Sequence, residues 1–215
     1  MNKFPEVNLI VAMTEGGLIG KDGGLPWKSS LDMAWFRKQT MGHPCIFGRE
    51  TAEKMGAGFP LKNRPCAVIS RKGWPGAPKD TPVFSDLLDV CRHFEDHDKI
   101  FIAGGARIYS LALNSASPWM PNQPMVDTII RTLFPDGLVD GDTYMDNDTL
   151  NLMACEFTHS NWEHYKLKQQ NGLYGYASDD DDQDAAFPGF VTAKSADTLF
   201  PWIQFEILKQ KGRSA

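Results

Sequence analysis

Short apolar segments alternate with helix-like segments along most of this chain, and this alternation constrains the fold more than any other feature. Short, largely apolar segments typical of buried strands occur at residues 7–13, 44–48, 64–70, 99–103 and 126–133, and within the third of them Cys66-Ala67-Val68-Ile69 is continuous and apolar. Segments with helical character lie between them, at residues 31–40, 49–55, 86–94 (with Ser85 as N-cap) and 106–113. Two further strand-like segments, at residues 156–168 and 203–208, have no helix between them. The pattern predicts an α/β fold with a mostly parallel sheet, flanking helices and an antiparallel C-terminal end.

Composition limits the organisation and the partners of the chain. Its 215 residues, 42% of them hydrophobic, are expected to form a single domain spanning residues 1–215. The net charge of −5 argues against a nucleic-acid or membrane partner. The four cysteines form no CxxC pair and have no metal-ligand spacing with the histidines, so we expect reduced thiols, no metal site and a cytoplasmic protein. The apolar run near the N-terminus is too short for a signal peptide or a membrane span.

An acidic run, Ser178 to Gln183, lies within a segment at about residues 172–198 that is rich in small residues. A calcium loop is one interpretation of successive aspartates. The spaced ligand pattern and closing glutamate of a calcium loop are absent, which favours a solvated insertion in the C-terminal hairpin.

Asp32 is the most informative single residue, because large apolar side chains surround it in the sequence. Trp27 precedes it, and Trp35 and Phe36 follow at helical spacing. An acid in the first turn of a helix is ordinarily solvated, with a residue such as Ser29 as N-cap. A solvent-facing helix stripe would not normally carry this much aromatic surface, so Asp32 is also a candidate anchor for a cationic or amidine-like ligand.

Four turns at the ends of predicted strands carry glycines or anion-binding side chains. They are the glycine-rich loop 14–24 and the motifs Gly48-Arg49-Glu50-Thr51, Ser70-Arg71-Lys72 and Gly104-Gly105-Ala106-Arg107. Each alone is compatible with an ordinary turn. Together, at the carboxyl edge of a parallel sheet, they indicate a dinucleotide with phosphates near helix N-termini.

The combined motifs resemble the dihydrofolate reductase family over about residues 7–208, interrupted by the acidic insertion. The residues that carry the resemblance are Leu25-Pro26-Trp27, Asp32 with Trp35-Phe36, Gly48-Arg49-x-Thr51, Pro60-Leu61-Lys62-Asn63-Arg64, Gly104-Gly105-x-Arg107-x-Tyr109, Gly141-Asp142-Thr143 and Phe205-Glu206-Ile207-Leu208. The resemblance implies an eight-stranded, mostly parallel sheet with an antiparallel C-terminal strand. It also implies NADPH-dependent reduction of 7,8-dihydrofolate to tetrahydrofolate, in support of one-carbon and thymidylate metabolism.

The resemblance assigns a catalytic group of three residues, Asp32, Trp27 and Leu25. The implied substrate-binding residues are Ile10, Ala12, Asp32, Met33, Phe36, Met55, Leu61, Arg64 and Thr132. Asp32 would accept two hydrogen bonds from the pterin, and Arg64 would clamp the α-carboxylate of the glutamate tail. The threonine that supports the carboxylate corresponds to Thr132, or to Arg131 if the alignment shifts by one residue.

The implied cofactor-binding residues border the nicotinamide and the phosphates. They are Ala12, Ile19, Gly20, Gly48, Arg49, Thr51, Ser70, Arg71, Gly104, Gly105, Ala106, Arg107, Ile108 and Tyr109. In the family the peptide corresponding to Gly104-Gly105 is cis. Two positions depart from the family pattern: Glu50 lies where a basic or neutral side chain is usual, and Ala103 replaces a larger aliphatic residue.

The implied mechanism is hydride transfer to pterin C6, with N5 protonated through a water rather than directly by Asp32. The implied partners are dihydrofolate and antifolate inhibitors, and we expect a monomer. Two alternatives stay open at this point: a pyrimidine reductase of riboflavin synthesis, and a non-catalytic folate-binding protein.

Overall fold

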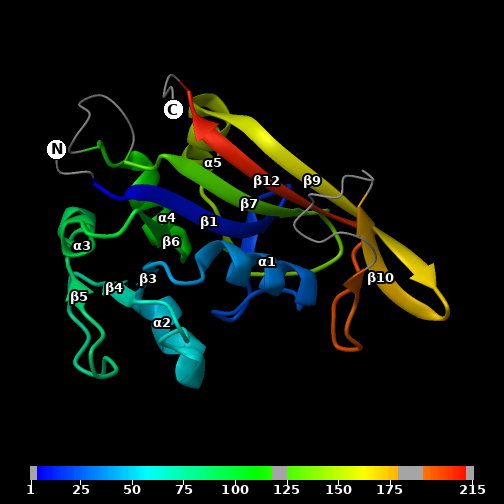
Figure 1. Cartoon of the computed structure of the whole chain (residues 1–215), viewed down its shortest axis with the longest axis horizontal. Helices are drawn as coiled ribbons and strands as arrows, with labels where there is room; N and C mark the ends of the chain where they lie inside the picture. The colour runs from blue at the N-terminus through cyan, green and yellow to red at the C-terminus, as the bar shows by residue number, and fades with distance from the viewer. Residues whose placement is uncertain (1–3, 118–124, 179–190, 212–215) are drawn as a thin grey trace.

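A ten-stranded mixed sheet organises the chain (Figure 1). The computed structural model describes residues 4–117, 125–178 and 191–211. The strands of this sheet are β1 (Glu6–Thr14), β3 (Cys45–Gly48), β4 (Cys66–Ile69), β5 (Val83–Phe84), β6 (Lys99–Ile102), β7 (Thr128–Phe134), β9 (Phe157–Gln170), β10 (Leu173–Ser178), β11 (Val191–Thr192) and β12 (Trp202–Gln210). Their order across the sheet is β11-β10-β9-β12-β7-β1-β6-β3-β4-β5. β2 (Leu18–Gly20) and β8 (Thr143–Tyr144) form a separate pair.

The six strands from β7 to β5 are parallel, and β12, β9, β10 and β11 continue the sheet with antiparallel pairings. The α/β class and the antiparallel C-terminal end are therefore confirmed. The expected number of eight strands is wrong for this sheet. The extra pairing comes from the segment predicted as an insertion. Asn171 and Gly172 have φ of 52° and 78°, which makes a tight hairpin turn. After this turn, β10 pairs back on β9.

The helices are α1 (Ser30–Thr40), α2 (Arg49–Met55), α3 (Leu87–His93), α4 (Ala106–Asn114) and α5 (Asn147–Glu156), with a short 3₁₀ turn at Gly56–Gly58. The sequence patterns predicted the first four but not α5. The N-cap of α3 is Asp86, whose carboxylate accepts from the Leu88 N–H, and not Ser85 as predicted. No helix in the described ranges is long and apolar enough to cross a membrane. The acidic run was predicted to be a solvated insertion, and all but its first residue lies outside the described residues.

Two apolar cores lie on opposite faces of the sheet, because side chains alternate along each strand. Val7, Leu9, Val11 and Met13 of β1 join the core beneath α3, α4 and α5. Ile10 of β1 joins the other core, with Trp27 and residues of α1 and α2. In Figure 1, α1 lies along the second face of the central strands. This face is the one on which the predicted substrate residues gather.

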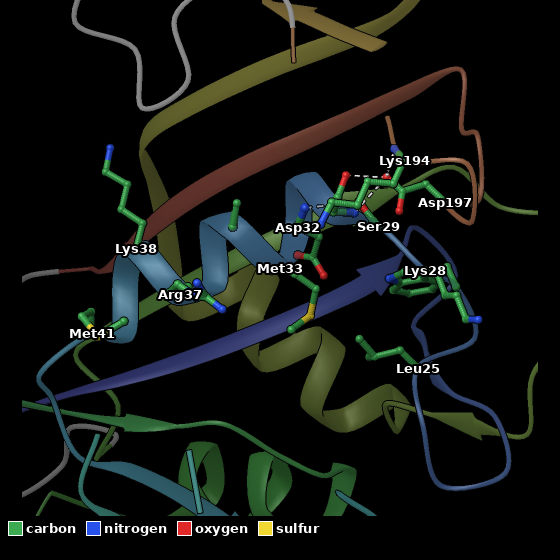
Figure 2. Close-up of a pocket in the computed structure, with 13 residues that line it drawn as sticks. Leu25, Lys28, Ser29, Asp32, Met33, Arg37, Lys38, Met41, Lys194 and Asp197 are labelled. Atoms are coloured by element: carbon green, nitrogen blue, oxygen red, sulfur yellow. Dashed lines mark hydrogen bonds between the residues drawn. The ribbon is translucent and has the colours of Figure 1, made fainter. Parts of the chain in front are cut away.

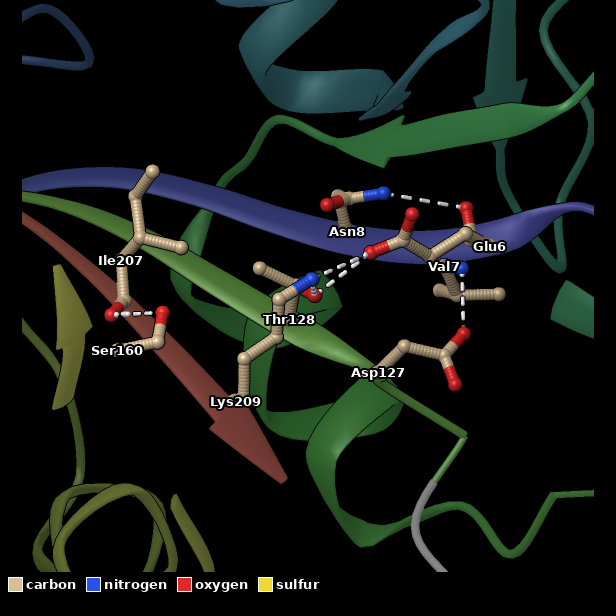
Figure 3. Close-up of polar contacts among 8 residues, drawn as sticks. All are labelled: Glu6, Val7, Asn8, Asp127, Thr128, Ser160, Ile207 and Lys209. Carbon is tan, nitrogen blue, oxygen red and sulfur yellow. Dashed lines mark hydrogen bonds and ion pairs between the residues drawn. The ribbon is translucent and has the colours of Figure 1, made fainter. Parts of the chain in front are cut away.

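A polar cluster at the amino end of β1 joins three strands (Figure 3). Glu6 Oε1 accepts hydrogen bonds from Thr128 Oγ1 at 2.7 Å and from Lys209 Nζ at 3.1 Å. Burial alone would raise the pKa of Glu6, but these hydrogen bonds and the charges of Lys209 and Lys99 outweigh it and lower the pKa. The cluster lies at the end of β1 opposite the predicted site, so we assign it to alignment of β1, β7 and β12.

The packing around Phe134 gives the first prediction. Phe134 is fully buried, with its ring centroid 4.4 Å from that of Trp27 and 4.7 Å from that of Phe200. Phe134→Ala should lower the free energy of unfolding by about 3–5 kcal/mol, because it opens a cavity between these rings. Urea denaturation measures the change. Leu138→Ala, at a side chain that is 52% exposed, is the control and should change stability by less than about 0.5 kcal/mol. A loss below about 1 kcal/mol in Phe134→Ala would contradict this packing.

Candidate active site

Asp32 is a buried carboxylate in the first turn of α1, and it points from the helix toward the central strands (Figure 2). Only 5% of the residue is exposed. Burial raises the pKa of Asp32 to about 6, and a hydrogen bond with the Thr132 side chain partly opposes that increase. The group therefore exchanges a proton close to neutral pH, which is the behaviour expected of a functional carboxylate rather than a solvated helix acid.

The register of the sheet explains why Thr132 meets Asp32. Ala12 of β1 and Thr132 of β7 are partners in the parallel ladder, and both lie on the face covered by α1. Arg131 lies on the opposite face, where its guanidinium bonds the carboxylate of Glu206 at 2.5 Å. Of the two alignments left open by the sequence, Thr132 is the one that supports Asp32.

Tyr109 connects the carboxylate region to the glycine turn. Its hydroxyl donates to the Ile10 carbonyl at 2.8 Å, and only 6% of the residue is exposed. Burial, together with the nearby charge of Asp32, raises the pKa of Tyr109 above its ordinary value. The phenol is therefore a fixed neutral donor that joins α4 to β1.

Trp27 is held in an aromatic group just before α1. Only 4% of the residue is exposed, and its ring contacts Phe134 and Phe200. Its indole N–H has no hydrogen-bond acceptor among the described residues. A buried donor of this kind usually has a partner in the working protein.

The remaining substrate residues divide between a half-buried wall and an exposed rim. Ala12, Phe36, Met55 and Leu61 are half-buried and pack against the same apolar core as Ile10. Leu25 and Met33 are 47% and 53% exposed, and together with Asp32 and Trp27 they line an open cavity of about 660 Å³. The structure thus brings Asp32, Trp27, Leu25 and Met33 to one cavity and places the half-buried group in the adjoining core.

Arg64 lies apart from that cavity and is held in place by its neighbours. Its guanidinium donates to Thr40 Oγ1 at 3.1 Å and to the Lys62 carbonyl at 3.3 Å, and it lies 5.7 Å from the centre of the Phe36 ring. Sequence reasoning found Arg64 but not Thr40, which has no recognisable motif of its own. A pre-ordered arginine next to an apolar wall can bind a carboxylate without first losing side-chain freedom.

The predicted cofactor residues lie at the carboxyl ends of the parallel strands. The Gly48 N–H donates to the Gly104 carbonyl at 2.7 Å, so the turns after β3 and β6 touch. The Gly104-Gly105 peptide is cis, as expected. A Cβ on Gly105 would approach Thr51 Oγ1 to 2.9 Å, and a Cβ on Gly48 would approach Ile108 to the same distance. The absence of side chains at these glycines lets the starts of α2 and α4 approach each other, an arrangement suited to a pyrophosphate.

The other predicted cofactor residues differ in burial and in the contacts that their side chains already make within the protein. Ile19 and Gly20 are buried in β2, at the base of the glycine-rich loop. The Ser70 hydroxyl donates to the Gly73 carbonyl at 2.8 Å, so it is engaged in its own turn, while Arg71 beside it is exposed. The cations of Arg49 and Arg107 lie 3.8 Å and 3.9 Å from Glu53 and Glu50, in exposed pairs that contribute little stability. Both arginines therefore keep their charge available to a phosphate.

Sequence comparison with known proteins identifies the family of this chain. The profile of the family described as dihydrofolate reductase matches residues 6–173. The chain belongs to the dihydrofolate reductase family. A dihydrofolate reductase of Haemophilus influenzae is 32% identical over 156 residues, covering 70% of this chain and 94% of that protein. A dihydrofolate reductase of Mycobacterium leprae is 37% identical over 112 residues, covering 52% of this chain and 67% of that protein.

A solved structure supports the fold independently. It is the dihydrofolate reductase from Enterococcus faecalis complexed with NADP(H) and RAB-propyl, with a TM-score of 0.64, 19% sequence identity and 96% coverage of both chains. As a member of the dihydrofolate reductase family, the chain is an NADPH-dependent oxidoreductase.

The raised pKa of Asp32 gives a prediction about stability. The folded state holds the proton more tightly than the unfolded state, whose ordinary pKa is 3.8, so stability falls as the pH rises from about 4 to about 6. Asp32→Asn should therefore stabilise the ligand-free protein at pH 7 by about 3 kcal/mol, and the gain should disappear near pH 4.

Urea denaturation at both pH values tests this expectation. Asp148→Asn, in the first turn of α5, controls for the general effect of removing one negative charge. A gain that is equal at the two pH values would show that ionisation of Asp32 does not oppose folding.

Proposed function

We propose that this chain reduces 7,8-dihydrofolate to 5,6,7,8-tetrahydrofolate, with NADPH as the reductant. The observation that carries the proposal is the Asp32 carboxylate, buried against Thr132 and open to a cavity next to an apolar wall. An amidine edge presents two N–H donors at the spacing of a carboxylate, so the pterin ring supplies the partners that the protein does not. Family membership and the printed names of the relatives support the same reaction.

The residues at the carboxyl edge fit NADPH. Gly48, Thr51 and the residues from Gly104 to Arg107 would hold the pyrophosphate, and Arg49, Ser70 and Arg71 would hold the remaining phosphate. Ala12, Ile19, Gly20, Ile108 and Tyr109 would border the nicotinamide. When bound, the cofactor supplies the hydride that is added at pterin C6.

The protein residues orient the substrate and control the proton. Asp32 fixes the pterin through its carboxylate and polarises the ring. The buried indole N–H of Trp27 is suited to hold the water that protonates N5, since it has no acceptor among the described side chains and backbone groups. Leu25 and Met33 would close on the pterin from the rim, and Phe36, Met55 and Leu61 would pack against the benzoyl ring. Arg64 would bind the α-carboxylate.

We propose that residues 1–215 act as a single domain in the cytoplasm, as a monomer that also binds antifolates and serves one-carbon metabolism. The four cysteines are all unpaired, which supports a reducing compartment. A pyrimidine reductase of riboflavin synthesis would need neither the Asp32–Thr132 pair nor the ordered Arg64. A non-catalytic folate-binding protein would bind dihydrofolate without oxidising NADPH.

The first test concerns Asp32 directly. Purified wild-type protein should oxidise NADPH only when dihydrofolate is present, as followed by the loss of near-ultraviolet absorbance. Asp32→Asn should lower kcat/KM at neutral pH by about 100-fold or more, because an amide cannot accept both N–H bonds and places no charge near the ring. Asp148→Asn is the matched control and should leave kcat/KM unchanged. Equal activity of Asp32→Asn and wild type at neutral pH would overturn the role of this carboxylate.

The second test concerns the glutamate tail. Arg64→Lys should raise the KM for dihydrofolate about tenfold with little change in kcat, because lysine loses the two-pronged contact and the hydrogen bond to Thr40. Arg92→Lys, at an exposed position on α3, is the control. A fall in kcat at unchanged KM would place Arg64 in the chemical step and contradict its assignment to the tail.

A further inference from the structure

One carboxylate lies among the residues that would hold the cofactor phosphates. Glu50 is the second residue of α2, between Arg49 and Thr51, both of which we assign to phosphate binding. An acid in the first turn of a helix ordinarily stabilises the helix start. A diphosphate group is strongly anionic at neutral pH, however, so a carboxylate at this point opposes the ligand that its neighbours attract. The contacts of Glu50 show which of these two effects matters here.

The Glu50 side chain contacts a cation outside its own helix. Its carboxylate lies 3.9 Å from the guanidinium of Arg107, the second residue of α4. By contrast, the next carboxylate of α2, Glu53, lies 3.8 Å from Arg49 on the same helix. Among the described residues, the cationic partner of Glu50 therefore belongs to the other of the two turns that would enclose the diphosphate. An acid that served only α2 would need no partner on α4.

The two turns are in direct contact at this point. The Gly48 N–H donates to the Gly104 carbonyl at 2.7 Å, and a Cβ on Gly105 would approach Thr51 Oγ1 to 2.9 Å. Glu50 lies between Gly48 and Thr51 in the chain, so the residues on both sides of it meet the turn after β6. The ion pair described above joins the same two turns, at the place where we locate the diphosphate.

The pair is exposed and contributes little to the fold. The side chains of Glu50 and Arg107 are 75% and 89% exposed, and ion pairs in solvent are weak. Each side chain can therefore change its partner when a ligand arrives. The charged side chains that pair here are two cations and two carboxylates, Arg49, Arg107, Glu50 and Glu53, so their charges cancel. These side chains together give a diphosphate no net electrostatic attraction.

Arg107 can turn from Glu50 to a phosphate, but Glu50 stays beside the site on α2. Binding of the diphosphate is then opposed in two ways, because Arg107 gives up its carboxylate and the diphosphate comes close to that same carboxylate. Water and salt weaken both effects, since the two side chains are largely exposed. We propose that Glu50 is an affinity-determining residue of the cofactor site, whose carboxylate makes NADPH and NADP⁺ bind more weakly than they would beside a neutral side chain at the same position.

This inference rests on the proposed cofactor site, and its test measures binding rather than turnover. Isothermal titration calorimetry would give the Kd of NADPH for the wild type and for Glu50→Gln, at low and at high salt. Glu50→Gln should lower the Kd about threefold to tenfold at low salt, because the repulsion ends and Arg107 loses its competing partner. The difference between the two proteins should shrink at high salt, which screens exposed charges.

A double variant separates the two effects of the carboxylate. Arg107→Gln alone should raise the Kd of NADPH, because it removes a phosphate ligand. Glu50→Gln should lower the Kd by a smaller factor in the Arg107→Gln background than in the wild type, since no arginine is left to compete for. An equal factor in both backgrounds would overturn the competition for Arg107.

Comparison of NADPH with NADH locates the effect on the cofactor. Both dinucleotides contain the diphosphate, and NADH lacks the 2′-phosphate. Glu50→Gln should therefore lower the Kd of the two by the same factor. A lower Kd for NADPH alone would place Glu50 at the 2′-phosphate and overturn its assignment to the diphosphate.

Glu95→Gln is the matched control, because it removes the same charge from an exposed turn between α3 and β6, at the opposite edge of the sheet. Its Kd for NADPH should equal that of the wild type. An unchanged or higher Kd in Glu50→Gln, or an equal fall in Glu95→Gln, would overturn the inference while leaving the proposed reaction intact. Absence of NADPH binding in every variant would instead overturn the proposed cofactor site itself.

Discussion

The placement of β1 between two parallel neighbours is the constraint on which the rest of the structure depends. β7 and β6 both pair with β1 in parallel, so the carboxyl ends of all three strands reach the same edge of the sheet. Alternation along β1 then sends Ile10 to the face under α1 and its neighbours Leu9 and Val11 to the opposite core. One strand therefore determines which residues can meet a ligand and which only stabilise the fold.

The second consequence of this arrangement is that the carboxylate and the glycine turn are mechanically connected. The Tyr109 hydroxyl donates to the Ile10 carbonyl, and Tyr109 is the fourth residue of α4, which begins just after the Gly104-Gly105 peptide. Ile10 in turn lies two residues before Ala12, the partner of Thr132 in the sheet. The Tyr109 hydroxyl therefore fixes α4 to the same strand that pairs with Thr132, the residue bonded to Asp32.

Much of the fold and of the candidate site could be predicted from the sequence. Strands that are buried on both faces appear in the sequence as apolar segments, and the turns that follow them at the edge of the sheet are marked by glycines. Other features have no local signal. The contact of Asp197 with Ser30 joins residues far apart in the chain, and the exposure of Leu25 and Met33 depends on the shape of an open cavity. The sequence does contain a signal for β10. Asn171-Gly172 is a typical two-residue hairpin turn, and it predicts a strand that pairs back on β9. Strand alternation would likewise have favoured Thr132 over Arg131 once Ala12 was assigned to the ligand face.

The caps of α1 explain why Asp32 is available to a ligand at all. An acid in a first helical turn commonly serves the unpaired N–H groups of its own helix. Here the Ser29 hydroxyl accepts from the Asp32 N–H at 3.2 Å, and Asp197 accepts from the Ser30 N–H at 3.1 Å. Since other side chains satisfy these donors, the Asp32 carboxylate is left to Thr132 and to the cavity. Burial without a cationic partner is what raises its pKa, so the same capping that stabilises the helix start maintains the unpaired acceptor that an amidine-bearing substrate would complete.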